Sequence, residues 1–206
     1  RLADELTALL ANKMQTEGIS FKKVKQNCKM ILSRFAEIPR EKEGKVKVGV
    51  VGEIYVKYSP LGNNNLEQFL TDEGAEVVVP GLLDFFMYCI VSNISDIELY
   101  GLHKIRKPAL DFVFKYLQKQ QNEIIGLMKA DGNFTPPTPI SHTMELIKDF
   151  MGFGTKMGEG WLLPAEMLEL NDEGVHNIVC TQPFGCLPNH ICGKGMMKPL
   201  KEKNPD

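Results

Sequence analysis

A short run of β-branched residues near residue 50 places the strongest constraint on how this chain can fold. Within KVKVGVVGE, residues 46–51 are rich in valine and the run closes at Gly52. Such a run, without polar alternation, is typical of a strand that is buried on both faces of a parallel sheet. NNNLEQFLTDEG then supplies asparagine caps, a helical stretch and a terminal glycine, and AEVVVP supplies a second strand. Strand, helix and strand at this length indicate a βαβ unit with a right-handed crossover.

A third strand is expected at 177–181, within HNIVCTQ. The three strands predict an α/β fold with an open, parallel sheet of Rossmann or flavodoxin-like type. Residues 46–51 would form its central strand, with the strands at 76–79 and 177–181 on either side. Helices fill a large insertion at about 81–174, and GKGMMKPLKEK begins a further helix that its proline limits. A further strand normally follows such a helix, so we expect the sheet of this chain to be incomplete.

Two stretches with apolar residues at helical spacing open the chain, RLADELTALLANKMQ and FKKVKQNCKMILSRFAEI, and Pro39 ends the second. They define an N-terminal helical segment, residues 1–44, ahead of an α/β domain, residues 45–206. The sequence begins at Arg1 rather than at a methionine and ends on KEKNPD, just after a helix-like stretch. We therefore expect it to be a piece of a longer polypeptide.

The composition excludes several classes of function. Of the 206 residues, 43% are hydrophobic and 24% charged, as in soluble globular proteins, and the net charge of −2 offers no electrostatic case for nucleic acid. No run is long and apolar enough to span a membrane, and we expect no secretory signal. The five cysteines are then expected to be thiols or metal ligands in a reducing compartment, which predicts a cytoplasmic protein.

Three of these cysteines, Cys180, Cys186 and Cys192, fall within VCTQPFGCLPNHICGKG. Their spacing, C-x5-C-x3-H-x-C, is a weak zinc signal because zinc sites favour tighter cysteine pairs. Thiolates are the usual ligands of iron–sulfur clusters, but a cubane needs about four ligands and one loop does not supply them all. The alternative is a loop shaped by glycine and proline with incidental thiols.

The cysteines differ in their expected surroundings. Cys180 lies inside the third strand and is expected to pack there, and the turn at Pro188 displaces Cys192. Cys28 and Cys89 lie in helical stretches, where a cysteine usually packs as a small hydrophobic residue. Cys186 lies between a glycine and a proline, in a loop whose backbone could come close to a bound cluster.

Topology predicts where a site would lie. In an open α/β sheet, ligands bind beyond the carboxyl ends of the strands, where the strand order reverses. That reversal falls between the first and third strands, so the loops at 52–65 and 181–195 should meet there. The residues that this places around one crevice are Cys186, Glu53, Tyr55 and Asn64.

Other signals are weaker. GKG opens an expected helix, so its amides and Lys194 could hold an anion such as a phosphate, or the segment could be a solvated helix cap. His190 could be a ligand or a hydrogen-bonding partner within the loop, and the second interpretation is favoured. Trp161 is expected in the core, although the tight GEGW turn that carries it and Glu159 could face the crevice. No nucleophile triad can be argued from order or spacing, and GFGTKMGEGW lacks the preceding strand of a dinucleotide-binding motif.

Three stretches together resemble one family: VGVVGEIYVKYSPLGNNNLEQFLTDEGAEVVVPG, GEGWLLPAEM and NIVCTQPFGCLPNHICGKGMMKPLK. They are similar to the dehydratase-like region of CoA-substrate-specific enzyme activases, relatives of the 2-hydroxyacyl-CoA (2-hydroxyglutaryl-CoA) dehydratase components. The resemblance runs from about residue 46 to the end. It implies that an activator ATPase injects a low-potential electron into a cysteine-held [4Fe-4S] component, which drives the reductive elimination of water from a 2-hydroxyacyl-CoA. Cys186 matches a cluster ligand of that family, and Cys180 and Cys192 do not clearly match one.

Two departures from the family limit what this chain is expected to do. It lacks the phosphate motifs of the ATPase, so we expect no ATP hydrolysis. It also lacks the upstream cysteine-bearing segment and the strand after KNPD. A [4Fe-4S] cluster is therefore expected in the full-length protein and none in this piece alone, which would be inactive by itself whether the parent is a lyase or its activator. The implied partners are the ATPase portion, in the same or another protein, and an acyl-CoA substrate. The alternative is a cofactor-free module that docks the ATPase portion.

Overall fold

The computed structural model of the chain describes residues 1–39 and 44–204. It divides into two compact units. A helical unit is formed by residues 1–43 with 116–137, and an α/β unit by residues 44–115 with 138–206. The long helix α6 (Lys107–Asp131) begins in the α/β unit and ends in the helical unit.

The helical unit contains α1 (Leu2–Glu17), α2 (Phe21–Ala36) and the later part of α6. Both N-terminal helices were predicted from the spacing of their apolar residues. Ser20 caps α2, because its hydroxyl oxygen accepts a hydrogen bond from the N–H of Lys23 at 3.4 Å. Cys28, predicted to pack as a hydrophobic residue, lines a small cavity of about 190 Å³ between α1 and α2, and burial raises the pKa of its thiol.

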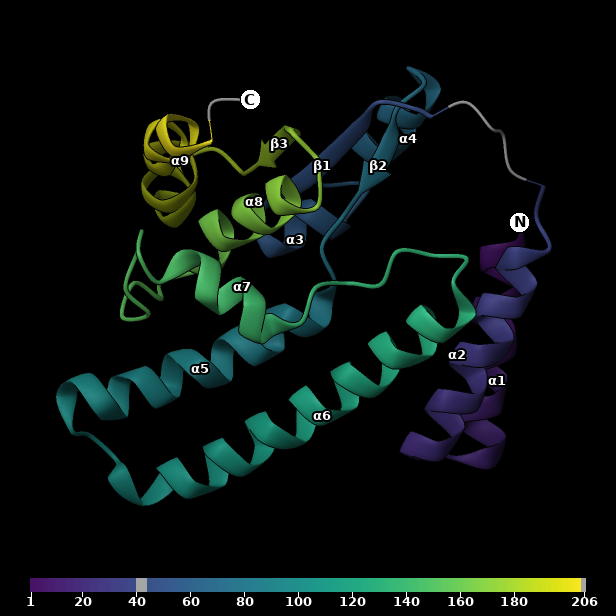
Figure 1. The fold of residues 1–206 in the computed structure, drawn as a ribbon, viewed down its shortest axis with the longest axis horizontal. Helices are drawn as coiled ribbons and strands as arrows, with labels where there is room; N and C mark the ends of the chain where they lie inside the picture. The colour runs from purple at the N-terminus through teal and green to yellow at the C-terminus, as the bar shows by residue number, and fades with distance from the viewer. Residues whose placement is uncertain (40–43, 205–206) are drawn as a thin grey trace. The chain divides into compact units, whose positions relative to one another are not determined.

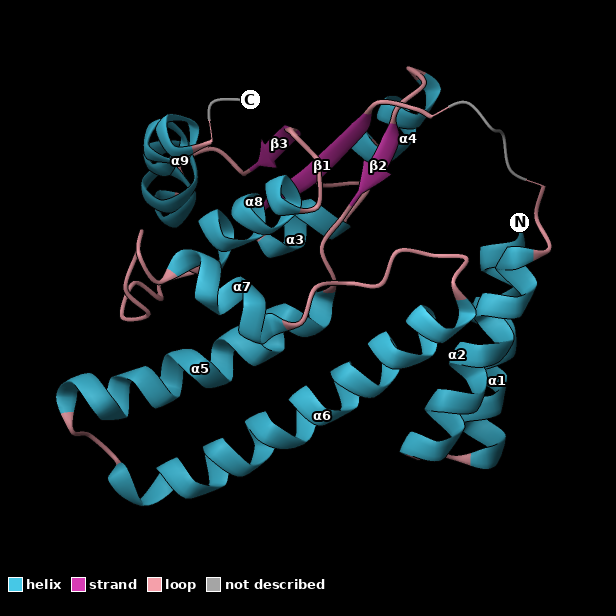
Figure 2. Ribbon diagram, viewed as in Figure 1, coloured by secondary structure: helices cyan, strands magenta, loops and turns pink. Residues whose placement is uncertain are grey.

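The α/β unit is built on three parallel strands, β1 (Lys47–Gly52), β2 (Glu76–Val78) and β3 (Asn177–Thr181), in the order β2-β1-β3 (Figures 1 and 2). Val48 pairs with Val77 on one side and with Asn177 on the other. The predicted open parallel sheet, with its valine-rich strand in the centre, is therefore confirmed. Val50 and Val51 of that strand are fully buried.

Helices cover both faces of the central strand. On one face, α8 (Leu162–Asp172) approaches so closely that a Cβ atom at Gly49 would lie 2.6 Å from Cδ1 of Leu170. Val48, the preceding residue, points to the opposite face. There it lines a cavity together with Leu70 of α4 (Leu66–Asp72), the helix that connects β1 to β2. Because Gly49 has no side chain, α8 packs directly against β1.

The core of the α/β unit is centred on Trp161, at the start of α8. Trp161 was predicted to lie in the core, and it is fully buried. Its ring lies 5.0 Å from that of Tyr88, on α5 (Leu82–Tyr100), and 4.9 Å from that of Phe153. The hydroxyl of Tyr88 donates to the carbonyl oxygen of Lys156 at 2.7 Å, which ties the segment before α8 to α5. Cys89 packs against the same core, as expected.

The remaining elements of the α/β unit are short. They are α3 (Ile54–Tyr58), η1 (Lys104–Arg106), α7 (Ile140–Ile147), η2 (Asn189–Gly193), η3 (Lys194–Met196) and α9 (Met197–Lys203). Two stretches expected to be loops therefore contain helical turns. α3 forms because the carboxylate of Glu53 accepts from the N–H of Val56 at 2.8 Å and caps it. Within residues 1–39 and 44–204, no helix combines the length and the apolar character that a membrane crossing requires.

Gly52, where β1 ends, provides a test of how closely β1 and β3 approach. Its φ is +143°, and a Cβ atom there would lie 1.9 Å from the carbonyl oxygen of Thr181. We expect Gly52→Ala to lower the free energy of unfolding by about 3 kcal/mol or more, measured by urea denaturation. Gly74→Ala is the matched control: its φ is +88° but a Cβ would meet nothing, so we expect a loss of about 1 kcal/mol. Equal losses would show that the contact with β3 is unimportant.

Candidate functional site

The loops that follow β1 and β3 begin side by side at the carboxyl end of the sheet. The N–H of Glu53 donates to the carbonyl oxygen of Thr181 at 2.9 Å, and the hydroxyl of Thr181 donates to the carbonyl oxygen of Val51 at 3.2 Å. β2 pairs with β1 on one side and β3 pairs with it on the other, and all three strands are parallel. The loops after β1 and β3 therefore meet as expected, and a ligand-binding switch point at this place stays a prediction.

Glu159, in the turn before α8, connects both loops. One carboxylate oxygen accepts from the N–H of Ile54 at 2.9 Å, in the segment after β1. The other accepts from the side-chain amide of Asn189 at 3.0 Å, in the segment after β3. Glu159 is only 5% exposed. The GEGW turn therefore lies against both loops, and Trp161 occupies the core behind it.

Asn189 continues this network to Cys186. The same amide nitrogen that donates to Glu159 lies 3.1 Å from the sulfur of Cys186. Asn189 is fully buried, and its amide oxygen has no hydrogen-bond partner among the described residues. An N–H directed at sulfur suits a thiolate or a metal-bound sulfur, because both carry negative charge. Cys186 is partly buried. The hydrogen bond from Asn189, in addition to packing, holds its side chain in place.

The two neighbouring cysteines have different surroundings. Burial raises the pKa of Cys180 to about 11, with smaller contributions from the carboxylates of Glu166 and Glu159. Burial also raises the pKa of Cys192. Both side chains therefore keep the thiol form to a higher pH than an ordinary cysteine does. Cys180 packs against the core from β3, as expected from its place in the strand, and Cys192 is 3% exposed.

No group of three or more histidine, cysteine, aspartate or glutamate side chains in the described part of the chain has the arrangement of a metal site. A cubane cluster needs about four ligands. The described residues therefore do not by themselves bring together the ligands of such a cluster.

No hydrogen bond among the described residues brings the side chains of the predicted residues of the 52–65 segment to Cys186. Glu53 directs its carboxylate at the N–H of Val56, and Tyr55 is 61% exposed. Asn64 lies before α4 with a φ of +56°, in the left-handed region that asparagine tolerates. The connection from Cys186 to this segment instead runs through Asn189 and Glu159 to the N–H of Ile54.

The remaining two predicted residues lie in the helical turns after Cys186. The imidazole of His190 is exposed, and its ring nitrogens lie 3.3 and 3.4 Å from the side-chain nitrogen of Gln182. This matches the favoured interpretation of a hydrogen bond within the loop. Lys194 begins η3, so the expected helix start is present, and anion binding there stays a prediction.

A buried set of charges lies beneath the site. Lys57, 1% exposed, pairs with Glu166, 2% exposed, at 2.7 Å. Burial still raises the pKa of Glu166 to about 7, although Lys57 opposes that shift. Burial likewise raises the pKa of Glu169 to about 8, against a 2.7 Å hydrogen bond from the hydroxyl of Thr143. These charges tie α8 to α3 and α7.

Sequence reasoning missed Asn189 as a site residue and missed the buried charges altogether. For the charges, a signal was present in WLLPAEMLEL. Every residue from Leu162 to Leu170 is buried, so the helix has no solvent face on which to place its two glutamates. A helix that is apolar all round and carries carboxylates three residues apart needs partners inside the protein. Nothing local marked Lys57 as one of those partners.

Removal of the Glu159 carboxylate should weaken the whole site. We expect Glu159→Ala to lower the free energy of unfolding by about 2–4 kcal/mol, because the N–H of Ile54 and the amide of Asn189 would each lose a buried partner. Glu159→Gln keeps one acceptor oxygen and should cost less. Urea denaturation of both variants, with the exposed Glu145→Ala on α7 as the control, measures the difference. A loss no larger than that of the control would contradict the network.

The raised pKa of Glu169 predicts how stability depends on pH. Its pKa lies at about 8 in the folded protein against an ordinary value of 4.5, so the folded state holds a proton that the unfolded state releases. The free energy of unfolding should therefore fall as the pH rises from 4.5 to about 8. Glu169→Gln should make this fall shallower, whereas Glu202→Gln, on the exposed side of α9, should not. Urea denaturation at several pH values in that range measures the free energy of unfolding of each variant. If Glu169→Gln left its pH dependence unchanged, Glu169 would be ionised in the folded protein.

The comparisons with known proteins add no assignment to this geometry. No protein-family model, curated protein or solved structure matches the chain. A functional conclusion therefore rests on the resemblance in the sequence motifs and on the network around Cys186.

Proposed function

We propose that this chain is the iron–sulfur-associated domain of a CoA-substrate-specific enzyme activase, related to the 2-hydroxyacyl-CoA dehydratase components. In this role it takes part in ATP-driven, low-potential electron transfer for reductive dehydration. The observation that carries the proposal is the position of Cys186. Its sulfur lies in the loop after β3, 3.1 Å from a buried amide that is itself fixed by Glu159.

Cys186 would supply one thiolate ligand to a [4Fe-4S] cluster. Because such a cluster needs about four ligands, the others would come from another part of a longer polypeptide or from a partner. The bound cluster supplies one-electron transfer at low potential. Cys186 is assigned rather than its neighbours because its sulfur accepts a hydrogen bond from the buried amide of Asn189.

Asn189 would have a defined role beside that sulfur. Hydrogen bonds to cluster sulfurs contribute to the reduction potential, because a donated N–H stabilises the more negatively charged reduced state. Glu159 holds the Asn189 amide in place and links it to the end of β1. Removal of the Asn189 side-chain amide should therefore lower the reduction potential of the cluster. Loss of Glu159 should affect that potential indirectly, because Asn189 would no longer be held in position.

The sheet is consistent with this role at the level of topology. Open parallel sheets bind ligands beyond the carboxyl ends of their strands, and Cys186 follows β3 at that end of the sheet. A flavodoxin-like sheet with its switch point between β1 and β3 is part of the proposal. The proposal further assigns an ATPase activator as the partner, an acyl-CoA as the substrate of the complete system and the cytoplasm as its location. These assignments come from the family resemblance.

A second candidate is a cofactor-free domain that docks the ATPase portion. It is favoured by apolar side chains exposed where α5 leads into α6, such as Ile105, which is 92% exposed. The others in that stretch are Leu99, Tyr100, Leu102 and Phe112. Exposed apolar patches of this kind mark interaction surfaces. This candidate requires no metal at Cys186.

The deciding experiment is iron and sulfide analysis of the native polypeptide that contains these residues, purified without oxygen. The proposal expects about four iron and four sulfide per chain, with visible cluster absorbance. Cys186→Ala should reduce both, and Cys192→Ala, in the same loop, should leave them unchanged. Circular dichroism would verify that each variant is folded. Unchanged iron in folded Cys186→Ala would refute the ligand assignment, and an iron-free protein that binds the ATPase portion would establish the second candidate.

A further inference from the structure

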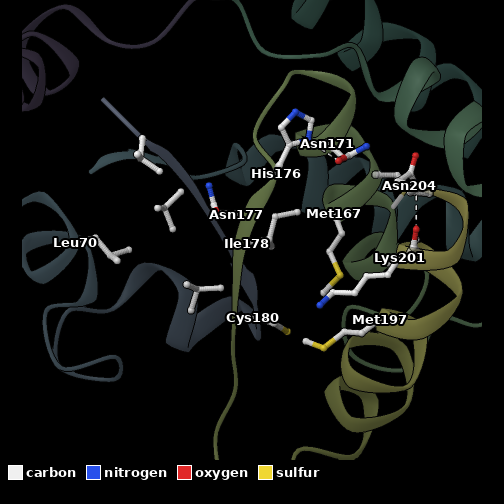
Figure 3. Close-up of a pocket in the computed structure, with 15 residues that line it drawn as sticks. Leu70, Met167, Asn171, His176, Asn177, Ile178, Cys180, Met197, Lys201 and Asn204 are labelled. Atoms are coloured by element: carbon white, nitrogen blue, oxygen red, sulfur yellow. Dashed lines mark hydrogen bonds between the residues drawn. The ribbon is translucent and has the colours of Figure 1, made fainter. Parts of the chain in front are cut away.

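Apolar side chains of the α/β unit meet solvent in two ways. Beside β3, the side chains of Met167, Ile178 and Met197 line a cavity of about 610 Å³ (Figure 3). At the α5–α6 turn, residues 99–112, they project instead (Figure 1). Ile105, in the η1 segment of this turn, is 92% exposed. A cavity suits a ligand of matching shape, whereas projecting apolar side chains suit a soft surface that they can enter.

Large apolar side chains are exposed all along the α5–α6 turn. The backbone bends at Gly101 and His103, whose φ values are +68° and +53°. The side chains that the bend turns outward are Leu99, Tyr100, Leu102, Ile105 and Phe112, each more than half exposed. Burial of such side chains is the main favourable term in folding, and here the fold does not use it. A group of this kind marks a surface that another structure covers.

The same turn is basic. Residues 99–110, LYGLHKIRKPAL, contain Lys104, Arg106, Lys107 and one histidine but no aspartate or glutamate, although the whole chain has a net charge of −2. Lys107 pairs with acidic side chains on either side of this segment, at 3.3 and 3.1 Å. Among the described residues, no carboxylate forms an ion pair with Lys104 or Arg106. Two cationic side chains are therefore available among the exposed apolar ones.

Cations between apolar side chains favour a lipid surface over a protein partner. Lysine is depleted in the core of protein interfaces, where its ammonium group would lose water. At a membrane surface, the aliphatic stems of Lys104 and Arg106 can lie along apolar chains while their charged ends reach phosphate groups. Tyr100 suits the same depth, because its ring is apolar and its hydroxyl polar. The turn thus matches the surface of an anionic membrane.

We propose that the α5–α6 turn binds the surface of membranes that contain anionic phospholipids. Leu102 and Ile105 enter the boundary between head groups and acyl chains, and Lys104 and Arg106 bind the phosphates. This is attachment to one face of the membrane and requires no spanning helix. Because one short turn carries it, the binding is weak and reversible. The inference does not depend on the proposed function.

Flotation with lipid vesicles tests this on the native polypeptide that contains these residues. The comparison is between vesicles of phosphatidylcholine alone and vesicles of phosphatidylcholine and phosphatidylglycerol in equal parts. We expect the anionic vesicles to bind about tenfold more tightly or better, and added salt to remove the difference. Lys104→Gln and Arg106→Gln should each lower the affinity for anionic vesicles about fivefold, because each removes one positive charge.

A second pair of variants tests the apolar contribution. Ile105→Ser should lower the affinity for anionic vesicles about tenfold. Leu61→Ser is the matched control and should change nothing, because Leu61 is 87% exposed in the same unit but lies in another loop. Circular dichroism would verify that each variant is folded.

Two results would overturn the proposal. One is equal binding to both kinds of vesicle, or binding to neither. The other is an Ile105→Ser variant that binds anionic vesicles as well as the unsubstituted protein does. If vesicles bound neither protein and Ile105→Ser weakened binding to the ATPase portion, the surface would be the protein contact of the second candidate.

Discussion

The close contact between α8 and the central strand is the constraint on which the α/β unit depends. Gly49 leaves β1 without a side chain where Leu170 approaches, and α8 seats there with no solvent-exposed face along Leu162–Leu170. From that position α8 also contacts α7, α9 and the turn η2 after Cys186. The turn that begins α8 then carries Glu159 to the carboxyl end of β1. One helix thus sets both the core and the geometry of the candidate site.

A helix buried on every side has an electrostatic consequence. Glu166 and Glu169 cannot reach solvent, so each depends on a partner from a neighbouring element. Lys57 comes from α3 and Thr143 from α7, and these contacts fix α8 relative to both. Burial costs more for the charged form than either partner restores, which is why both carboxyl groups have raised pKa values.

A hydrogen-bond donor at its sulfur distinguishes Cys186 from the two neighbouring cysteines. Burial and nearby carboxylates raise the pKa of Cys180 and of Cys192, whereas the sulfur of Cys186 accepts an N–H from Asn189. Asn189 can make that contact because Glu159 accepts from the same amide and holds it inside the protein. The unpaired oxygen of Asn189 faces the same buried surroundings. The proposed ligand role of Cys186 rests on this buried network and not on the cysteine alone.

Local pattern was sufficient for much of this protein. Some structural signals depend only on residues that are close in sequence, such as the valine run, the glycine that ends it and the asparagines before α4. The strands, their parallel pairing and the two N-terminal helices could therefore be predicted. The position of Cys186 followed from the rule that parallel strands end at one edge. Tertiary structure alone decided which side chains meet. Glu159 and Asn189 are 30 residues apart, and Lys57 and Glu166 are 109 apart. No periodicity records such pairs, because they form only after the sheet has brought distant loops together and burial has left each polar group in need of a partner.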